Sequence, residues 1–380
     1  MKSKKIYYWS PFLSPIATCK AVINSAFSLS KYNTEYESSI INFFNEFHLF
    51  KNEIEKKKIN LINFYHFNFS KYLPYQGKFK SRFSFAIFFI LGFVPLIKIL
   101  KKKQPEYLII HLISSLPLII LILFNFKTKF ILRISGYPKL NFFRKTLWKI
   151  ALKKTYCVTC PTNNTLEYIK RLNLVDHSKL KLLYDPVINL KEVINKRKKI
   201  INYKNYYLAI GRLTAQKNFI FLCRAIKQIV KNNSNIKLLI AGNGEQEREI
   251  SNFIRNNKLE KNIILIGFQQ NIFPYLKNAK GFILTSLWED PGFVLIEAGI
   301  CRTPVLTSDA WPGPVEIIKN NYNGFQFKSN NLIDFEQNFE KLENTKNLNE
   351  IILNNLKFTK KFTLFNHYLK LDKILSNKCN

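Results

Sequence analysis

Short apolar runs alternate with helix-length amphipathic segments through most of the chain. Such alternation predicts parallel β-sheets whose strands are joined by crossover helices. It is clearest in the second half, where the expected strands are Tyr206–Ile210, Lys237–Ala241, Ile263–Ile266, Gly281–Thr285 and Pro304–Thr307. Helices are expected over about 218–231 and 245–256 and from about 291 onward. This half is therefore predicted to be a doubly wound domain whose ligands bind at the carboxyl ends of the strands.

The first half is less regular, with apolar runs at more varied spacing. The expected strands there are Ile6–Trp9, Ser39–Asn42, Tyr107–His111, Phe130–Ile134 and Cys157–Thr159. Because 380 residues exceed one ordinary hydrophobic core, we expect two domains. A lysine-rich segment between about Asp185 and Tyr206 is the best candidate for the linker. The expected division is 1–190, 191–350 and a basic C-terminal helix over 351–380 that packs back on the first domain.

Two apolar runs in the first half approach the length that spans a bilayer. Tyr107–Phe126 contains His111 and Pro117, and a strand, a turn and a buried helix explain it best because they preserve the alternation. Phe83–Leu100 contains a glycine, a proline and one lysine. We expect this run to form a helix that lies on a membrane or partly in it, with a true span as the alternative.

The charge balance indicates an anionic partner. The chain holds 59 basic and 25 acidic residues, a net charge of +34, and residues 1–185 hold 30 basic against 9 acidic residues. Such a field favours a membrane surface, phosphorylated substrates or nucleic acid. Nucleic acid is not expected as a partner, because the basic residues are spread and accompany no aromatic–basic signature of a known module. Pro11 and Pro15 interrupt the first apolar stretch, which argues against a signal peptide and favours the cytoplasm.

The first half also carries features of an interfacial surface. Lysine clusters at Lys56–Lys58 and Lys101–Lys103 flank the apolar run Phe83–Leu100. Aromatic residues are dense nearby, at Phe64, Tyr65, Phe67, Phe69, Tyr72 and Tyr75. We therefore expect this half to dock on an anionic membrane surface, peripherally on the inner face of the cytoplasmic membrane. A lysine-rich composition combined with a buried helix is the alternative.

The stretch from Ser286 to Phe325 is the most informative for chemistry. Glu289 follows a predicted strand, and Glu297 lies in a helix whose first turn is expected to contain Pro291. The two carboxylates would then be on the order of 7–8 Å apart along the helix axis. The backbone amides of Gly292–Val294 lie between them and form an anion site at a helix N-terminus. This order of groups suits a sugar, a phosphate and a ribose, and the alternative is two solvated acids at a helix start.

A second feature, Gly211 to Asn218, also follows a predicted strand and precedes a helix. Arg212 and Lys217 can both reach the crevice above the strand ends. A guanidinium and an ammonium at that place suit a diphosphate. The alternative is a pair of surface cations in a very basic protein.

Together these features resemble a known family. The segments GRLTAQKN, LLIAGNG, IILIGF, EDPGFVLIE, RTPVLTSD and NGF occur in the order seen in family 4 of the retaining glycosyltransferases. The resemblance covers roughly residues 206–327 and includes the E-x7-E pair Glu289 and Glu297. It implies the α/β GT-B fold, with two Rossmann-like, doubly wound domains whose parallel sheets face each other across a cleft. The C-terminal domain would bind a nucleotide-sugar donor, and the N-terminal domain would be on the acceptor side.

The resemblance also implies roles for individual residues. Arg212 and Lys217 would bind the donor diphosphate and offset the charge of the leaving group. Glu289 would hold hydroxyls of the transferred sugar, and Glu297 would bind the ribose. The other donor-site positions implied are Gly211, Gly267, Phe268, Gly292, Phe293 and Val294. Of these, Gly267 and Phe268 would help to seat the base.

The first half resembles the family more weakly. His111 ends a predicted strand, and the family often has a histidine there that faces the donor sugar. The alternative is a strand-end histidine whose hydrogen bonds are satisfied within the core. The loop from Ser10 to Thr18 departs from the family, which commonly has a Gly-Gly near the phosphates.

The implied activity is retaining transfer of a hexose or an N-acetylhexosamine from a UDP- or GDP-linked donor to a glycan acceptor. A lipid-linked acceptor in the synthesis of lipopolysaccharide, capsule or O-antigen would suit the expected membrane docking. No cofactor or metal is expected, since no two of the six aspartates are separated by a single residue and the D-x-D metal motif is absent. Arg212, Lys217 and helix amides would meet the diphosphate charge instead. A non-catalytic nucleotide-sugar-binding protein of the same fold is the alternative.

Overall fold

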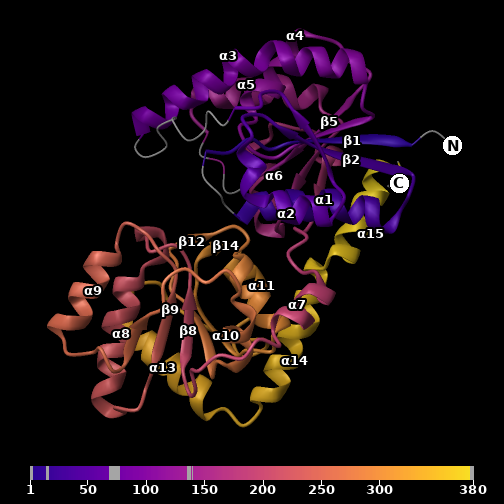
Figure 1. Cartoon of the computed structure of the whole chain (residues 1–380). Helices are drawn as coiled ribbons and strands as arrows, with labels where there is room; N and C mark the ends of the chain where they lie inside the picture. The colour runs from indigo at the N-terminus through magenta and orange to yellow at the C-terminus, as the bar shows by residue number, and fades with distance from the viewer. Residues whose placement is uncertain (1–2, 14–16, 68–77, 135–137, 139, 377–380) are drawn as a thin grey trace. The chain divides into compact units, whose positions relative to one another are not determined.

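The chain folds into two units, each built on a parallel β-sheet (Figure 1). The computed structural model describes residues 3–13, 17–67, 78–134, 138 and 140–376. Unit 1 comprises Met1–Pro186 and Leu364–Asn380, and unit 2 comprises Val187–Thr363. The chain therefore enters unit 2 close to the expected boundary at 190/191. It returns to unit 1 after α14 (Leu348–Thr359) rather than at 350/351, because α14 packs on α11 (Phe293–Ile300) of unit 2.

Unit 1 has a seven-stranded sheet of order β3-β2-β1-β4-β5-β6-β7. Its strands are β1 (Lys4–Trp9), β2 (Tyr36–Asn42), β3 (Asn60–Asn63), β4 (Tyr107–Ile110), β5 (Lys129–Arg133), β6 (Cys157–Cys160) and β7 (Leu180–Leu182). All pairings are parallel, for example Tyr8 with Ile109 and Ile109 with Ile131. The order reverses between β1 and β4, so the loops after these two strands diverge at one edge of the sheet.

Helices cover both faces of this sheet. They are α1 (Ala17–Tyr32), α2 (Lys51–Lys56), α3 (Lys78–Lys103), α4 (Ser115–Leu123), α5 (Phe142–Lys154), α6 (Asn163–Leu172) and α15 (Leu364–Leu375). Figure 1 shows α3, α4 and α5 on one side of the sheet and α1, α2 and α15 on the other. The Tyr107–Phe126 run becomes β4 and α4, as the alternation predicts.

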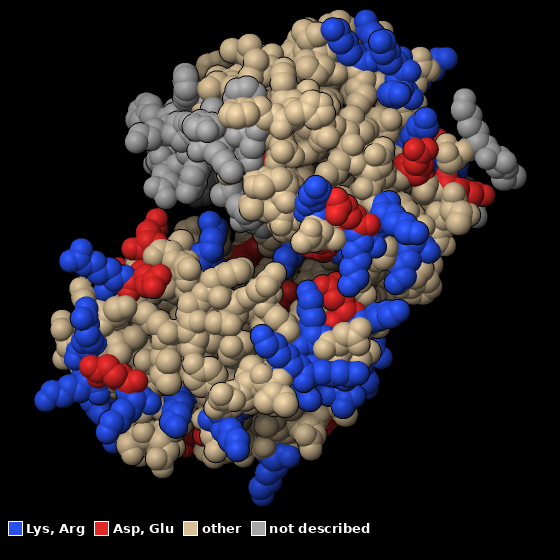
Figure 2. Space-filling view, in the orientation of Figure 1, with Lys and Arg blue, Asp and Glu red and all other residues tan. Residues whose placement is uncertain are grey.

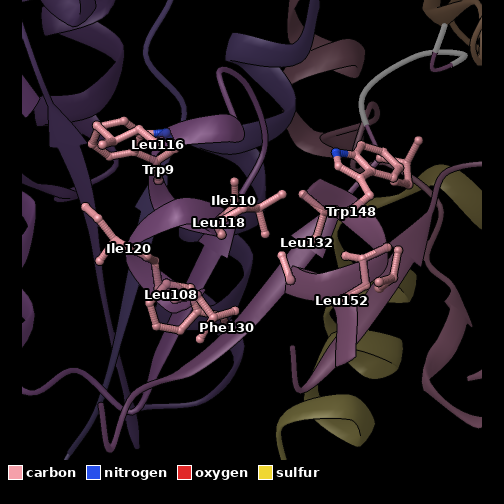
Figure 3. Close-up of a cluster of buried hydrophobic side chains, with 14 of the residues drawn as sticks. Trp9, Leu108, Ile110, Leu116, Leu118, Ile120, Phe130, Leu132, Trp148 and Leu152 are labelled. Atoms are coloured by element: carbon pink, nitrogen blue, oxygen red, sulfur yellow. The ribbon is translucent and has the colours of Figure 1, made fainter. Parts of the chain in front are cut away.

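The core beneath α3 to α6 is the larger of the two in unit 1. Alternate residues of the strands point into it, among them Trp9, Leu108 and Leu132 (Figure 3). From the helices it receives Leu116, Leu118 and Ile120 of α4 and Trp148 and Leu152 of α5. Successive side chains of a strand point to opposite faces, so neighbours such as Tyr8 and Ile109 enter the second core with α1, α2 and α15.

Helix α3 accommodates a proline in its middle. Pro95 has no backbone N–H, so the carbonyl of Leu91 loses the hydrogen bond that a helix would normally supply. The hydroxyl of Tyr65 donates to that carbonyl at 2.9 Å. No helix in the described part of the chain is long and apolar enough to cross a membrane.

The structure separates the two lysine clusters that were expected to share a surface. Lys56 ends α2, whose Ile54 enters the core on the α1 and α15 side, whereas Phe88 of α3 enters the opposite core. The expectation that Lys56–Lys58 flank the α3 surface is therefore wrong, because the β-sheet lies between them. Phe64 and Tyr65 pack against the core, Phe67 is exposed, and Phe69, Tyr72 and Tyr75 lie outside the described residues.

Unit 2 has a six-stranded parallel sheet of order β10-β9-β8-β11-β13-β15 and a separate two-stranded ribbon, β12-β14. The strands are β8 (Tyr207–Ile210), β9 (Leu238–Ala241), β10 (Ile263–Leu265), β11 (Gly281–Leu284), β12 (Trp288–Glu289), β13 (Val305–Ser308), β14 (Trp311–Pro312) and β15 (Phe325–Phe327). The remaining helices are α7 (Leu190–Lys196), α8 (Phe219–Asn232), α9 (Glu247–Asn256), α10 (Phe273–Asn278), α12 (Pro314–Ile317) and α13 (Leu332–Asn344). Helices α8, α9 and α13 enclose the main core of this unit.

Three strands of the two main sheets were not expected from the sequence, namely β3, β7 and β15. Each lies at an edge of its sheet and has only three or four residues. Polar residues such as Asn60, Lys181 and Gln326 interrupt their apolar pattern. An edge strand has one unpaired side that tolerates such residues, so its sequence signal is weak. The expected linker also contains a short helix, α7.

A buried polar chain fastens α15 to the rest of unit 1. His367 Nδ1 lies 2.7 Å from the carbonyl oxygen of Tyr184, which can only accept, so this nitrogen carries the proton. Nε2 of the neutral ring then accepts from the Ser25 hydroxyl at 2.8 Å. The Tyr8 hydroxyl lies 3.0 Å from Ser25 and completes the chain as a donor. Burial lowers the pKa of His367 to about 4.

Because His367 is buried as a neutral ring in these hydrogen bonds, we expect unit 1 to lose stability in acid. Its folded-state pKa of about 4 lies below the usual value of 6.5, so the stability is present above pH 6.5 and is lost as the pH falls toward 4. The full loss is about 3 kcal/mol. Unfolding in urea should be followed by the fluorescence of Trp9 and Trp148, which are buried in unit 1.

The control is His367→Gln, which cannot titrate. Glu46 shifts stability in the opposite direction, because burial raises its pKa to about 7, so only the difference between the two proteins isolates His367. The wild type should lose its advantage over the variant between pH 6.5 and 4. Parallel pH curves for the two proteins would contradict the assignment.

Candidate functional site

The candidate site lies at the carboxyl edge of the unit 2 sheet. The strand order reverses between β8 and β11, which is where an open α/β sheet binds its ligands. The segment Gly211–Asn218 follows β8, and the segment Thr285–Gly292 follows β11. The two segments that the sequence singled out therefore emerge side by side at the switch point.

Backbone hydrogen bonds align the loops along this edge. The Gly211 amide donates to Ala241 O at 3.0 Å, and the Gly242 amide donates to Gly267 O at 2.9 Å. These bonds link the loop after β8 to the end of β9, and the loop after β9 to the loop after β10. Lys217 lies against the first of them, since a Cβ on Gly211 would come within 2.9 Å of its Cε.

An ion pair joins the loops after β8 and β11. Lys217 Nζ donates to Glu289 Oε1, and the side chains of the two residues are only 14% and 11% exposed. The Ser286 hydroxyl donates to the same oxygen at 2.8 Å. Charge-assisted hydrogen bonds of this kind are the strong ones, particularly where water is largely excluded. The carboxylate of Glu289 is consequently fixed by two donors from two loops.

Further contacts fix the backbone that carries Glu289. The Leu287 amide donates to Gln216 O at 2.8 Å, and Gln216 Nε2 returns a bond to Trp288 O at 2.8 Å. On the other side, β12 pairs with β14, and the Gly313 amide donates to Glu289 O at 3.0 Å. Gly313 permits a close approach, because a Cβ there would lie 2.0 Å from the backbone oxygen of Pro291.

Helix α11 starts later than expected. Gly292 precedes it with a left-handed φ of 95°, and the helix runs from Phe293 to Ile300. The expectation that Pro291 occupies its first turn is therefore wrong, since the left-handed residue at 292 lies between them. Glu297 remains five residues into the helix and is half-buried. The amides of Gly292, Phe293 and Val294 lie at the N-terminal end, where helical N–H groups have no partner within the helix.

The remaining predicted residues of unit 2 lie along the same edge. Arg212 is exposed in the loop after β8, and within the described residues no ion pair joins it to a carboxylate. Gly267 and Phe268 follow β10, and the Phe268 ring is 73% exposed. Lys217, by contrast, is already paired with Glu289, so the two expected phosphate-binding cations lie in different electrostatic surroundings.

His111 lies apart from these residues in the sequence and belongs to unit 1. It follows β4, and its amide donates to Trp9 O at 2.8 Å. Its side chain is buried beside the ion pair of Arg133 and Asp185, in a small cavity that His367 also lines. Burial, reinforced by Arg133, holds the pKa of His111 well below its usual range, so the ring is neutral at pH 7. Residues 14–16 of the first loop lie outside the described part of the chain.

In the part of the chain that the structure describes, no group of three or more His, Cys, Asp or Glu side chains is arranged to hold a metal ion. The independence from metal expected from the missing D-x-D motif remains a prediction.

Comparisons with known proteins agree with the geometry. Residues 191–357, from α7 to α14, match the family model of glycosyl transferases, group 1. An uncharacterized glycosyltransferase of Methanocaldococcus jannaschii is 28% identical over 76% of this chain and 73% of its own length. The UDP-Gal:alpha-D-GlcNAc-diphosphoundecaprenol alpha-1,3-galactosyltransferase of Escherichia coli is 27% identical over 54% of this chain and 56% of its own length.

A solved glycosyltransferase structure from Rickettsia africae has the same fold. It superimposes with a TM-score of 0.76 at 18% identity and covers 99% of both chains. The two Rossmann-like units are therefore those of the GT-B fold. The family match places the candidate site inside a segment similar to group 1 glycosyl transferases, and glycosyltransferase activity is supported. Membership of family 4 and the roles of Glu289 and Glu297 stay predictions.

The structure adds two residues to which the sequence assigned no role. Ser286 orients the Glu289 carboxylate, and Gly313 admits the Pro291 backbone. The position of Ser286 three residues before Glu289 was the one available signal. The role of Gly313 depends on a contact across a ribbon, which residue spacing does not reveal.

The Lys217–Glu289 pair predicts strong energetic coupling. Removing one partner of a buried pair leaves an uncompensated charge, so Lys217→Met or Glu289→Gln alone should destabilise unit 2 by about 3 kcal/mol. The loss of unfolding free energy in the double variant should be smaller than the sum of the losses in the two single variants, by about 1 kcal/mol or more. Denaturant unfolding followed by circular dichroism measures both quantities.

The exposed pair Lys170–Glu167 provides the matched control, since its side chains are 36% and 54% exposed. Its coupling should be no more than about 0.5 kcal/mol. Additive losses at Lys217 and Glu289 would show that the pair contributes nothing specific.

Proposed function

We propose that the protein is a retaining glycosyltransferase that transfers a hexose or an N-acetylhexosamine from a UDP- or GDP-linked donor to a glycan acceptor. One observation carries the proposal. The Lys217–Glu289 ion pair, fixed by Ser286, lies at the switch point of the unit 2 sheet and inside the segment that matches group 1 glycosyl transferases. A cation and a carboxylate in contact suit the junction of a donor, where a phosphate is joined to a polyhydroxylated sugar.

Each group then has a defined part in donor binding. Lys217 contacts the phosphate next to the sugar, and Arg212, exposed at the same edge, binds the diphosphate with its planar fork. Glu289 accepts hydrogen bonds from sugar hydroxyls while Ser286 holds its orientation. The amides of Gly292–Val294 add donors at a helix N-terminus. Glu297 binds the ribose, farther along α11.

The remaining predicted site residues are assigned to the base of the donor and, in unit 1, to the donor sugar. Gly211 has no side chain and so leaves space for the Lys217 side chain beside the loop after β8. Gly267 and Phe268 contact the base beside the end of β10. We keep His111 as the residue of unit 1 that faces the donor sugar. Its low pKa means that it acts as a neutral hydrogen-bonding group and contributes no charge.

The proposed reaction retains the anomeric configuration. The acceptor hydroxyl attacks the anomeric carbon on the face that the diphosphate leaves, and its proton passes to the departing phosphate oxygen. One glycosidic bond forms and one carbon–oxygen bond to phosphate breaks. Lys217 and Arg212 stabilise the negative charge that develops on the leaving group. Glu289 is not proposed as a covalent nucleophile, because Lys217 and Ser286 already occupy one of its oxygens.

The proposed acceptor is a glycan carried on a lipid, in the synthesis of a surface polysaccharide such as lipopolysaccharide, capsule or O-antigen. The name of the Escherichia coli relative describes transfer from UDP-Gal to a sugar on diphosphoundecaprenol, which supports this choice. We accordingly propose that the enzyme works in the cytoplasm, peripherally on the inner face of the membrane. A protein of the same fold that binds the donor without turning it over is the second candidate, and nucleotide release in the presence of acceptor distinguishes the two.

The donor site can be tested by removing its charges. Glu297→Ala and Lys217→Ala should each lower transfer at least ten-fold, because a lost hydrogen bond to a charged group is worth about 1.5–3 kcal/mol. Transfer is measured as nucleotide release from UDP- and GDP-linked hexoses and N-acetylhexosamines, with an undecaprenyl-diphosphate-linked sugar as acceptor.

Glu260→Ala and Lys261→Ala are matched controls, since both residues are exposed in unit 2 away from the switch point. They should leave nucleotide release unchanged, and circular dichroism should confirm that all four variants are folded. Near-normal transfer by folded Glu297→Ala would remove that residue from the donor site.

Independence from metal is a separate prediction. It rests on the absence of a D-x-D motif and on the cations Arg212 and Lys217 in the loop after β8. Transfer should persist in excess EDTA at its original rate. Complete loss in EDTA that magnesium or manganese restores would contradict the proposal that these cations suffice.

A further inference from the structure

The solvent side of helix α3 is apolar over its first half and basic toward its C-terminal end. Its buried residues recur every four positions, at Ser84, Phe88, Gly92, Leu96 and Leu100. The opposite stripe is exposed and consists of Ala86, Ile90, Val94, Lys98 and Lys102. Ile90 is 71% exposed and Val94 is 53% exposed. A surface helix normally presents polar residues to water, so this outward stripe requires another explanation.

Helix α5 presents a similar mixture. Phe142 and Phe143 begin the helix and are 79% and 81% exposed. Ile150 follows on the same outward side at 48%, whereas Trp148 and Leu152 are buried on the other. Lysines and an arginine surround these apolar residues, namely Arg144, Lys145, Lys149, Lys153 and Lys154, all exposed.

The two helices belong to one surface. Helix α4 packs against both α3 and α5 and adds Leu123, which is 60% exposed at its end. Figure 2 shows an extended area of unit 1 that carries neither acidic nor basic side chains, with both basic and acidic side chains at its border. From Lys78 to Leu166 the sequence contains a single acidic residue, Glu106, and that residue lies between α3 and β4, outside all three helices.

We propose that the exposed side of α3, α4 and α5 is a docking surface for an anionic lipid bilayer. Exposed Phe, Ile and Val side chains would insert into the boundary between head groups and acyl chains, and the surrounding lysines would contact anionic head groups. The inference deepens the proposed function, on which it rests for its purpose, because a lipid-linked acceptor would be presented at that bilayer.

The charges decide between a bilayer and a second copy of the chain. Pairing two copies through this surface would bring lysine clusters together with no carboxylate to compensate them, and like charges at close range repel. An anionic bilayer supplies the missing charge along with an apolar interior. An exposed apolar patch of this extent is also unusual for a protein surface that has no partner.

The test measures binding to vesicles. The full-length protein should float with vesicles of phosphatidylcholine and phosphatidylglycerol, and far less with vesicles of phosphatidylcholine alone. Phe142→Ser/Phe143→Ser should lower the partition coefficient at least about ten-fold. Lys149→Glu/Lys153→Glu should lower it by a similar factor, with the wild-type binding itself weakened by high salt.

Matched variants of unit 2 control for the changes themselves. Ile200→Ser/Ile333→Ser removes two large apolar side chains that are 88% and 70% exposed. Lys261→Glu/Lys346→Glu makes the same change of charge at exposed positions. Both controls should bind vesicles like the wild type. Circular dichroism verifies that each variant is folded.

Three results would overturn the proposal. One is wild-type protein that does not float with anionic vesicles. Another is a Phe142→Ser/Phe143→Ser variant that binds as well as its control. The third is a dimer in sedimentation equilibrium that this variant abolishes while no vesicle binding is seen, which would identify a second copy as the occupant. Vesicle binding does not require turnover, so failure of the proposed transferase activity would appear separately, as bound protein that releases no nucleotide.

Discussion

Parallel strand pairing is the constraint from which the organisation of this protein follows. Every pairing in both main sheets is parallel, so each strand must be followed by a crossover before the next one can be added. All carboxyl ends then lie at one edge, and the loops that leave this edge are held by the sheet beneath them. Where the strand order reverses, two such loops diverge and leave room for a ligand. In unit 2 these are the loops that carry Lys217 and Glu289, and in unit 1 His111 follows one of the corresponding strands.

A chain with a large excess of positive charge uses its few carboxylates selectively. Asp185 neutralises buried Arg133 in unit 1, and Glu289 neutralises half-enclosed Lys217 in unit 2. A single charge in either place would be expensive to bury, whereas a pair with additional hydrogen bonds is tolerated. The second pair differs in lying at the edge where a ligand would bind. A donor that offers both a phosphate and sugar hydroxyls can exchange partners with it without leaving either charge uncompensated.

The two faces of unit 1 differ because the helices on them have different compositions. On the side of α1, α2 and α15 a polar chain through His367 joins the C-terminal helix to the sheet. On the side of α3, α4 and α5 the helices carry no acidic residue, and they keep apolar residues on their outer surface. The same apolar richness that builds a large core therefore also produces an outer surface suited to lipid. The proposed donor site in unit 2 and the proposed lipid-docking surface in unit 1 are built from different segments of the chain.

The amino-acid sequence by itself determined the central strands, the crossover helices and the two loops that carry the candidate chemistry. These signals are local, since a buried parallel strand is a short apolar run and the loop residues follow it directly. The apolar pattern did not predict the edge strands β3, β7 and β15, because an edge strand tolerates polar residues. The pairing of Lys217 with Glu289 joins residues 72 positions apart, and the burial of His111 depends on Arg133 and α15. Only the tertiary structure decided these features and the outward direction of the Ile90 stripe, because each depends on which segments pack together in space.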